Sequence, residues 1–194
     1  MGGAITWEAI SKDTFKVLLT YYRDCNGINQ DSATIDVSSN CLAKQLKATL
    51  VSKEDISPFC TSVCSRCTDR SCSVNYGIEK IELSALLVTT DFIKRGCCNL
   101  TLSWSTCCRS IPLLSTNQNF YLESKMNACL SNGNNSPSFI EPPVSLLCLG
   151  QEQVISCAAF DYENDSLRYT LTPALKDSAT SITYQTPYTY TKPI

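Results

Sequence analysis

The chain has 194 residues, with 13 cysteines and no histidine. Without histidine, it cannot form a Ser-His-Asp triad, a Cys-His pair or a histidine-ligated zinc or haem site. Its 16 basic and 18 acidic residues give a net charge of −2, and no basic run attracts nucleic acid. No stretch reaches the roughly 18 apolar residues of a membrane span. Carboxylate chemistry, thiolate chemistry or a non-catalytic role remain.

Alternation of apolar and polar residues predicts an all-β protein. The first two predicted strands, 5–9 and 15–21, form a hairpin around a turn at 11–13. Residues 42–51 also have helix propensity, but their length and the surrounding strands favour a strand. The further predicted strands lie near 33–37, 45–51, 77–89, 99–105 and 119–126.

The chain changes character at 131–143, where Asn, Ser, Gly and Pro predict a loop or linker. Three strand-like runs follow, at 144–149, 153–159 and 167–171. We therefore predict a disulfide-rich β-sandwich domain over 1–133 and an Ig-like or cadherin-like β-sandwich over 134–194. An Ig-like sandwich needs about 100 residues, so we expect the second domain to be incomplete, continuing in a longer protein or completed by another chain.

The cysteine density predicts disulfides and an oxidising compartment, with any targeting segment outside this sequence. Four cysteines within 13 residues also have the spacing C-x3-C-x2-C-x4-C, which a four-thiolate zinc site could use. We favour disulfides for this loop. The pairing is left open for the twelve cysteines expected to be bonded: Cys25, Cys41, Cys60, Cys64, Cys67, Cys72, Cys97, Cys98, Cys107, Cys108, Cys129 and Cys148.

Two vicinal pairs, Cys97-Cys98 and Cys107-Cys108, flank the predicted strand 99–105. Neighbouring residues of a strand point to opposite faces, so each pair is expected to tie this strand to two different neighbours. A vicinal redox disulfide is the alternative. Because the count is odd, at least one thiol is unpaired within the chain, and Cys157, in a predicted strand, is expected to be a buried free thiol.

Asp161, Glu163 and Asp165 alternate in a loop before a predicted strand. Oxygen ligands at alternate loop positions are typical of calcium sites, so calcium is the one candidate cofactor. A solvated acidic turn fits the pattern equally well. Asp161 and Asp165 as the carboxylate pair of a glycoside hydrolase are a third, weaker interpretation.

Several segments together resemble the N-terminal region of the large cell-surface proteins of Bacteroidota that are associated with gliding motility and adhesion. The resemblance covers nearly the whole chain, and the ordered set of motifs is more specific than any one of them. The segments are Gly2-Gly-Ala-Ile-Thr-Trp7, Leu19-Thr-Tyr-Tyr-Arg-Asp-Cys-Asn-Gly27, Trp104-Ser-Thr-Cys-Cys-Arg109, Ser136-Pro-Ser-Phe-Ile-Glu-Pro-Pro143 with Cys148, and Phe160-Asp-Tyr-Glu-Asn-Asp-Ser-Leu-Arg-Tyr169.

The chain departs from that pattern at three places. Ala4 replaces an acidic residue, Ser110 replaces the common Asn, and Glu163-Asn164 stands where Asp-Gly is usual. The last departure weakens the calcium interpretation.

The resemblance implies type IX secretion, a place on the bacterial cell surface, further domains downstream and no catalytic activity. We therefore expect an extracellular, non-enzymatic structural or adhesive module. Its expected partners are other copies or downstream domains of a surface assembly, and surface glycans, with no nucleic acid and no membrane span. A filament subunit completed by a neighbour's strand is the alternative, and a carboxylate-dependent glycan hydrolase is a weaker one.

Overall fold

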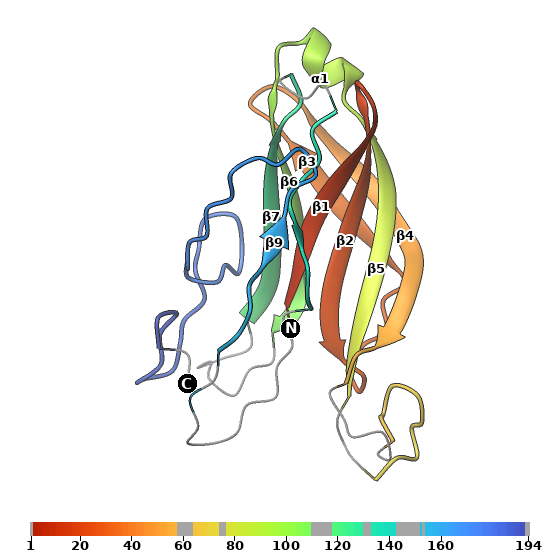
Figure 1. Ribbon diagram of the computed structural model, residues 1–194, viewed down its shortest axis with the longest axis vertical. Coiled ribbons are helices and arrows are strands. Elements are labelled where there is room, and N and C mark those ends of the chain that lie inside the picture. The colour runs from red at the N-terminus through yellow and green to blue at the C-terminus, as the bar shows by residue number, and fades with distance from the viewer. Residues whose placement is uncertain are drawn as a thin grey trace.

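The computed structural model describes residues 2–57, 64–73, 77–109, 118–129, 133–142, 152 and 154–192. Seven antiparallel strands form one sheet, in the order β1-β2-β5-β4-β3-β6-β7 (Figure 1). The seven strands predicted before residue 131 are thereby confirmed, including a strand rather than a helix at 42–51. Their bounds are β1 Gly2–Ser11, β2 Thr14–Asp24, β3 Ser32–Ser38, β4 Ala43–Asp55, β5 Ile78–Val88, β6 Asn99–Arg109 and β7 Gln118–Asn127.

The period-two pattern of the sequence decides which face of each strand is buried. In β2, Phe15, Val17 and Leu19 are fully buried, and in β3 the same holds for Ile35 and Val37. Side chains between them on the strand point outward because successive residues face opposite sides of a sheet. One continuous apolar cluster lines the inner face from β1 to β7.

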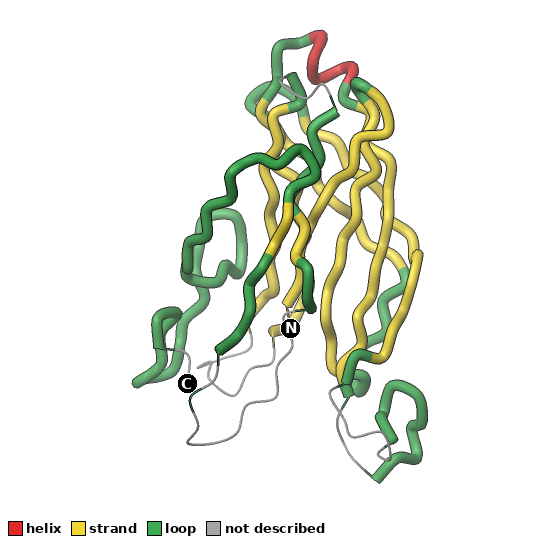
Figure 2. Tube along the Cα trace, in the orientation of Figure 1, coloured by secondary structure: helices red, strands yellow, loops and turns green. Residues whose placement is uncertain are grey.

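The sheet curls until its two halves face each other across this core (Figure 2). Tyr21 of β2 and Trp104 of β6 are not on neighbouring strands, yet their ring centroids lie 5.1 Å apart. Burial raises the pKa of Tyr21 to about 12, so its hydroxyl stays protonated and donates a 2.9 Å hydrogen bond to the Gln30 carbonyl. The all-β, disulfide-rich fold class is confirmed, with the strands in one curled sheet.

The two edge strands of the sheet, β1 and β7, approach each other along a seam. Gly3 lies at this approach. A Cβ atom there would be 2.6 Å from the Thr20 carbonyl oxygen and 2.9 Å from Cδ1 of Leu122 in β7. The absence of a side chain at Gly3 therefore lets β1 pass close to β7.

A short helix, α1 (Thr90–Lys94), follows β5 and was not predicted. It is fixed to the β1–β2 turn, because the Thr89 amide donates to the Asp13 carbonyl at 2.8 Å and the Thr90 hydroxyl donates to the Asp13 carboxylate. The Thr90 hydrogen bond lowers the pKa of Asp13. No helix in the described ranges is long and apolar enough to cross a membrane.

After the sheet, regular structure is sparse in the described residues. Strand β8 (Ser138–Phe139) pairs with β9 (Ala159–Phe160) in a two-stranded sheet. Of the predicted strand 153–159, the described residues are 154–159, and among these only Ala159 lies in a strand; 153 and 144–149 lie outside the described residues. The predicted strand 167–171 does not form. No described strand pairs with it, and Leu171 is 69% exposed. The domain boundary at 133/134 stays a prediction.

Replacing Gly3 with Ala should destabilise the protein by about 1–3 kcal/mol, the usual range for an overpacked site. Gly2→Ala is the matched control, because its Cβ would meet only Tyr22 Cδ2, at 3.6 Å. Urea denaturation measures both free energies of unfolding. Equal stability of the two variants would contradict the close approach of β1 and β7.

Candidate functional site

The vicinal pair before β6 links that strand to two neighbours, as its position predicts. Cys97 is bonded to Cys41, in the β3–β4 turn, and Cys98 is bonded to Cys129, just after β7. The Cα atoms are 6.1 Å and 5.1 Å apart, within the usual disulfide range. These two bonds fasten one end of the sheet.

A second group of disulfides fastens the loop between β4 and β5. Cys67 is bonded to Cys25 at the end of β2, and Cys64 is bonded to Cys72. Gly77 packs against this junction, since a Cβ there would lie about 3 Å from both bonded sulfurs of the first pair. Three of the four cysteines of the possible zinc site, Cys64, Cys67 and Cys72, are therefore in disulfides. Cys60, the fourth, and Cys148 lie outside the described residues.

The second vicinal pair does not tie β6 to two neighbours, as predicted, but forms the vicinal disulfide of the alternative, whose redox role stays a prediction. Cys107 and Cys108 are bonded to each other, and both are exposed at the end of β6. The β6–β7 register shifts between Thr106 and Arg109, so the ladder is irregular where the two cysteines lie. They therefore tie β6 to no other strand.

Cys157 is unpaired among the described cysteines, but its side chain is exposed rather than buried. The expectation of burial was wrong because the described residues 154–158 form no strand, so no described sheet covers Cys157.

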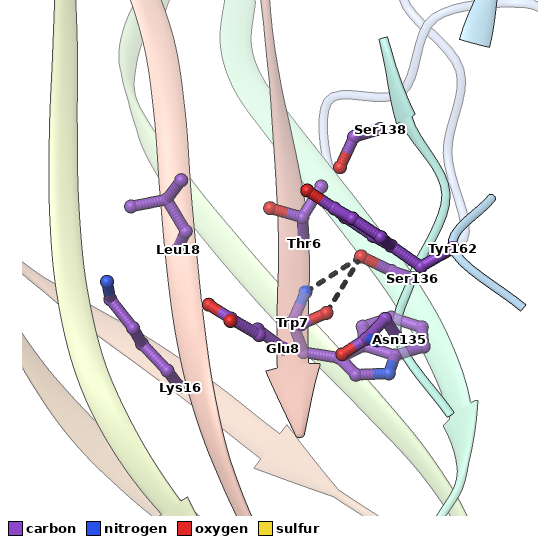
Figure 3. Close-up of a pocket in the computed structure, with 9 residues that line it drawn as sticks. All are labelled: Thr6, Trp7, Glu8, Lys16, Leu18, Asn135, Ser136, Ser138 and Tyr162. Carbon is purple, nitrogen blue, oxygen red and sulfur yellow. Dashed lines mark hydrogen bonds between the residues drawn. The ribbon is translucent and has the colours of Figure 1, made fainter. Parts of the chain in front are cut away.

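The candidate functional site is the outer edge of β1. Residues 134–138, which follow β7 and are called the returning chain below, lie along this edge. The Ser136 amide donates to the Trp7 carbonyl at 3.0 Å. Ser136 Oγ accepts from the Trp7 amide at 2.8 Å and donates to the Trp7 carbonyl at 3.3 Å (Figure 3). Two residues along the strand, the Ala9 amide donates to Asn135 Oδ1 at 2.8 Å. Side chains of the returning chain thus accept hydrogen bonds from backbone amides of β1 that would otherwise be open to pairing with a further strand.

A small hollow of about 210 Å³ lies beside this contact. The Tyr162 ring, from the acidic turn 161–165, extends over it, and Leu18 of β2 lies on the opposite side (Figure 3). The other lining residues are Thr6, Trp7, Glu8, Lys16, Asn135, Ser136 and Ser138.

The acidic turn holds the returning chain in place. Glu163 Oε1 accepts a 2.7 Å hydrogen bond from the Asn135 side-chain amide, and Asp165 accepts one from Asn134 at 3.4 Å. Asp161 Oδ1 accepts the backbone amides of Glu163 and Asp165, each at 3.0 Å. All three carboxylates therefore have a structural role within the turn or across to 134–135.

In the part of the chain that the structure describes, no three potential metal ligands are grouped so that they could hold an ion. The calcium site at Asp161, Glu163 and Asp165 stays a prediction, as does the hydrolase pair.

Sequence reasoning assigned no structural contact to Asn134, Asn135 and Ser136, because an Asn- and Ser-rich run is also the composition of a linker. Their role becomes visible only once β1 is known to be an edge strand.

Comparisons with protein-family models, with curated proteins and with solved structures give no match for this chain. The assignment of a function therefore rests on the residues and their geometry.

Replacing Ser136 with Ala removes the acceptor of the Trp7 amide. Leaving such a donor unsatisfied costs about 1–3 kcal/mol, so hydrogen exchange at the Trp7 amide should become faster. Ser138→Ala is the matched control, because Ser138 lines the same hollow and makes no side-chain hydrogen bond to any described residue. Unchanged exchange at Trp7 in the Ser136 variant would show that the returning chain is not held this way.

Proposed function

We propose that the chain is an extracellular, non-enzymatic structural and adhesive module, the N-terminal part of a long bacterial surface protein that serves adhesion or gliding. The observation that carries this proposal is the covalent bracing of the sheet. Three disulfides, Cys25–Cys67, Cys41–Cys97 and Cys98–Cys129, join segments 31 to 56 residues apart in sequence. Such bonds persist in oxidising compartments outside the cytosol.

Disulfides suit a protein exposed to shear and proteases. Each one restricts the unfolded chain and typically adds about 2–4 kcal/mol to stability. Because the bonds lie at the strand ends and loops, they brace the places where a sheet begins to fray. The resemblance to Bacteroidota surface proteins, which includes the bonded Cys25 segment, supports the same role.

The residues after the sheet support a place within a larger assembly. Ile140, Tyr162, Tyr169 and Leu171 are each between 56% and 69% exposed. An isolated two-stranded sheet is marginally stable in water. Tyr169 lies beside β9, because its hydroxyl accepts the Ala159 amide at 3.0 Å, so an exposed aromatic ring lies next to this small sheet, as at an interaction surface. Downstream domains of the same protein are the partners we propose for it.

Retention under flow tests the adhesive role. Microspheres coated with the chain are washed over bare glass, over a surface coated with the same chain, and over an immobilised neutral polysaccharide. We expect retention well above albumin-coated microspheres on at least one surface, because an adhesive module must resist shear. Retention equal to albumin on all three surfaces would contradict the proposal, and a reduced and alkylated chain is the control for native structure.

The exposed apolar residues also favour the second candidate, a filament subunit completed by a neighbour's strand. It predicts a sedimentation coefficient that rises with protein concentration, because strand addition joins successive copies. Analytical ultracentrifugation measures this directly. A monomeric mass over the whole accessible concentration range would exclude the filament and leave the adhesive module standing.

A further inference from the structure

The outer face of β3, β6 and β7 forms a hollow that the proposed function does not yet use. Its volume is about 520 Å³, and every lining residue is polar or, in the case of Tyr121, carries a polar group. The lining residues are Asp36, Ser38, Thr101, Ser103, Ser105, Asn119, Tyr121, Glu123, Lys125, Lys176, Asp177 and Ser178.

The sheet register arranges these groups in rows. Ser103 of β6 lies opposite Asp36 of β3 on one side and opposite Glu123 of β7 on the other. Thr101, two residues away on the same face, lies opposite Lys125 of β7. Neighbouring strands are about 4.8 Å apart, so the hydroxyl, carboxylate and ammonium groups of adjacent strands are close enough for one small ligand to contact several of them.

A turn late in the chain forms the wall of the hollow. Asp177 Oδ1 accepts the backbone amides of Ala179 and Thr180 at 2.9 Å and 2.7 Å. The Gln118 side chain of β7 makes two hydrogen bonds to the Thr183 backbone, of 2.9 Å and 2.8 Å. The wall is therefore held against β7 before any ligand arrives, which lowers the cost of ordering it on binding.

Much of the hydrogen-bonding capacity of the hollow is unused. Ser38, Thr101, Ser105 and Asn119 make no side-chain hydrogen bond to any described residue. A hydroxyl both donates and accepts, and an amide offers both functions as well.

Charge in the hollow is partly cancelled. Glu123 forms an ion pair with Lys125 at 3.2 Å and accepts a hydrogen bond from the Tyr121 hydroxyl at 3.1 Å. Three carboxylates and two ammonium groups line the hollow in all. A small, nearly balanced charge provides no strong selection for an anion or a polycation.

We propose that this hollow binds a neutral saccharide, as a ligand site of the adhesive module on whose proposed function it rests. Saccharide hydroxyls donate and accept in the same way as the groups that line it. The half-buried Tyr121 ring offers an apolar face of the kind on which a sugar ring packs. A protein partner would need an apolar or aromatic centre to its interface, and among the described lining residues only Tyr121 is aromatic and none is aliphatic.

Titration with neutral linear oligosaccharides tests the site. Hexamers of β-1,4-linked glucose, N-acetylglucosamine, xylose and mannose are added one at a time to the folded chain, and binding is measured by calorimetry and by amide chemical shifts. We expect at least one to bind with a Kd of about 1 mM or tighter. Ser103→Arg places a long side chain in the centre of the hollow and should weaken that binding at least about tenfold.

Ser84→Arg is the matched control, since Ser84 is a partly exposed residue of β5 outside the hollow. If the Ser103 variant fails to fold, Ser105→Arg, at an exposed position of the same row, replaces it. Absence of binding to all four hexamers, or equal binding by the Ser103 and Ser84 variants, would overturn the proposal. Retention of coated microspheres on glass or on the chain itself would then still support the adhesive module, so the two proposals fail separately.

Discussion

A sheet that curls without closing leaves two rows of backbone groups at its edges, and those groups must find partners. In this protein the constraint falls on β1, whose edge faces the seam with β7. The returning chain meets it through Ser136 and Asn135, which supply oxygens to the amides of Trp7 and Ala9. The seam therefore decides where the later part of the chain lies, and the acidic turn in that part is oriented by Glu163 against Asn135.

Different interactions stabilise the core of the sheet and its ends. The core depends on apolar side chains buried between the two halves, such as Tyr21 against Trp104. The ends depend on covalent bonds and on one well-buried ion pair, Arg23 with Glu79, whose atoms are 2.7 Å apart across β2 and β5. Arg23 also donates to the Gly27 carbonyl at 2.7 Å, so it joins the end of β2 to the turn that follows.

The sequence predicts the sheet well because each of its strands has one buried face. Phe15, Val17 and Leu19 alternate with outward residues, and period-two alternation has few other interpretations. The opposite faces of Cys97 and Cys98 were predicted for the same local reason. Period two does not reveal strand order, however. The sequence therefore could not show that β1 and β7 are the edge strands, or that Asn135 and Ser136 bind the edge of β1.

The remaining features depend on contacts between distant segments. The sequence leaves the vicinal bond between Cys107 and Cys108 open as an alternative, because the two vicinal pairs look alike locally and only the irregular β6–β7 register separates them. The polar hollow requires Thr101 and Ser103, which alternation places on the outer face, and also a turn near Asp177 that only the tertiary path of the chain brings beside β7. Outward polar residues are the ordinary surface of a strand, and the turn makes them the floor of a hollow.

The disulfides have a mechanical consequence for a chain pulled from its two ends. Without cross-links, the stretch from Cys25 to Cys129 would extend to roughly 350 Å. With them, the shortest covalent path runs along the backbone to Cys41, crosses to Cys97 and crosses again from Cys98 to Cys129. That path reaches only roughly 70 Å. Tension between Cys25 and Cys129 would thus be carried by sulfur–sulfur bonds past β4, β5, β6 and β7, so these four strands would add no length when the chain is stretched.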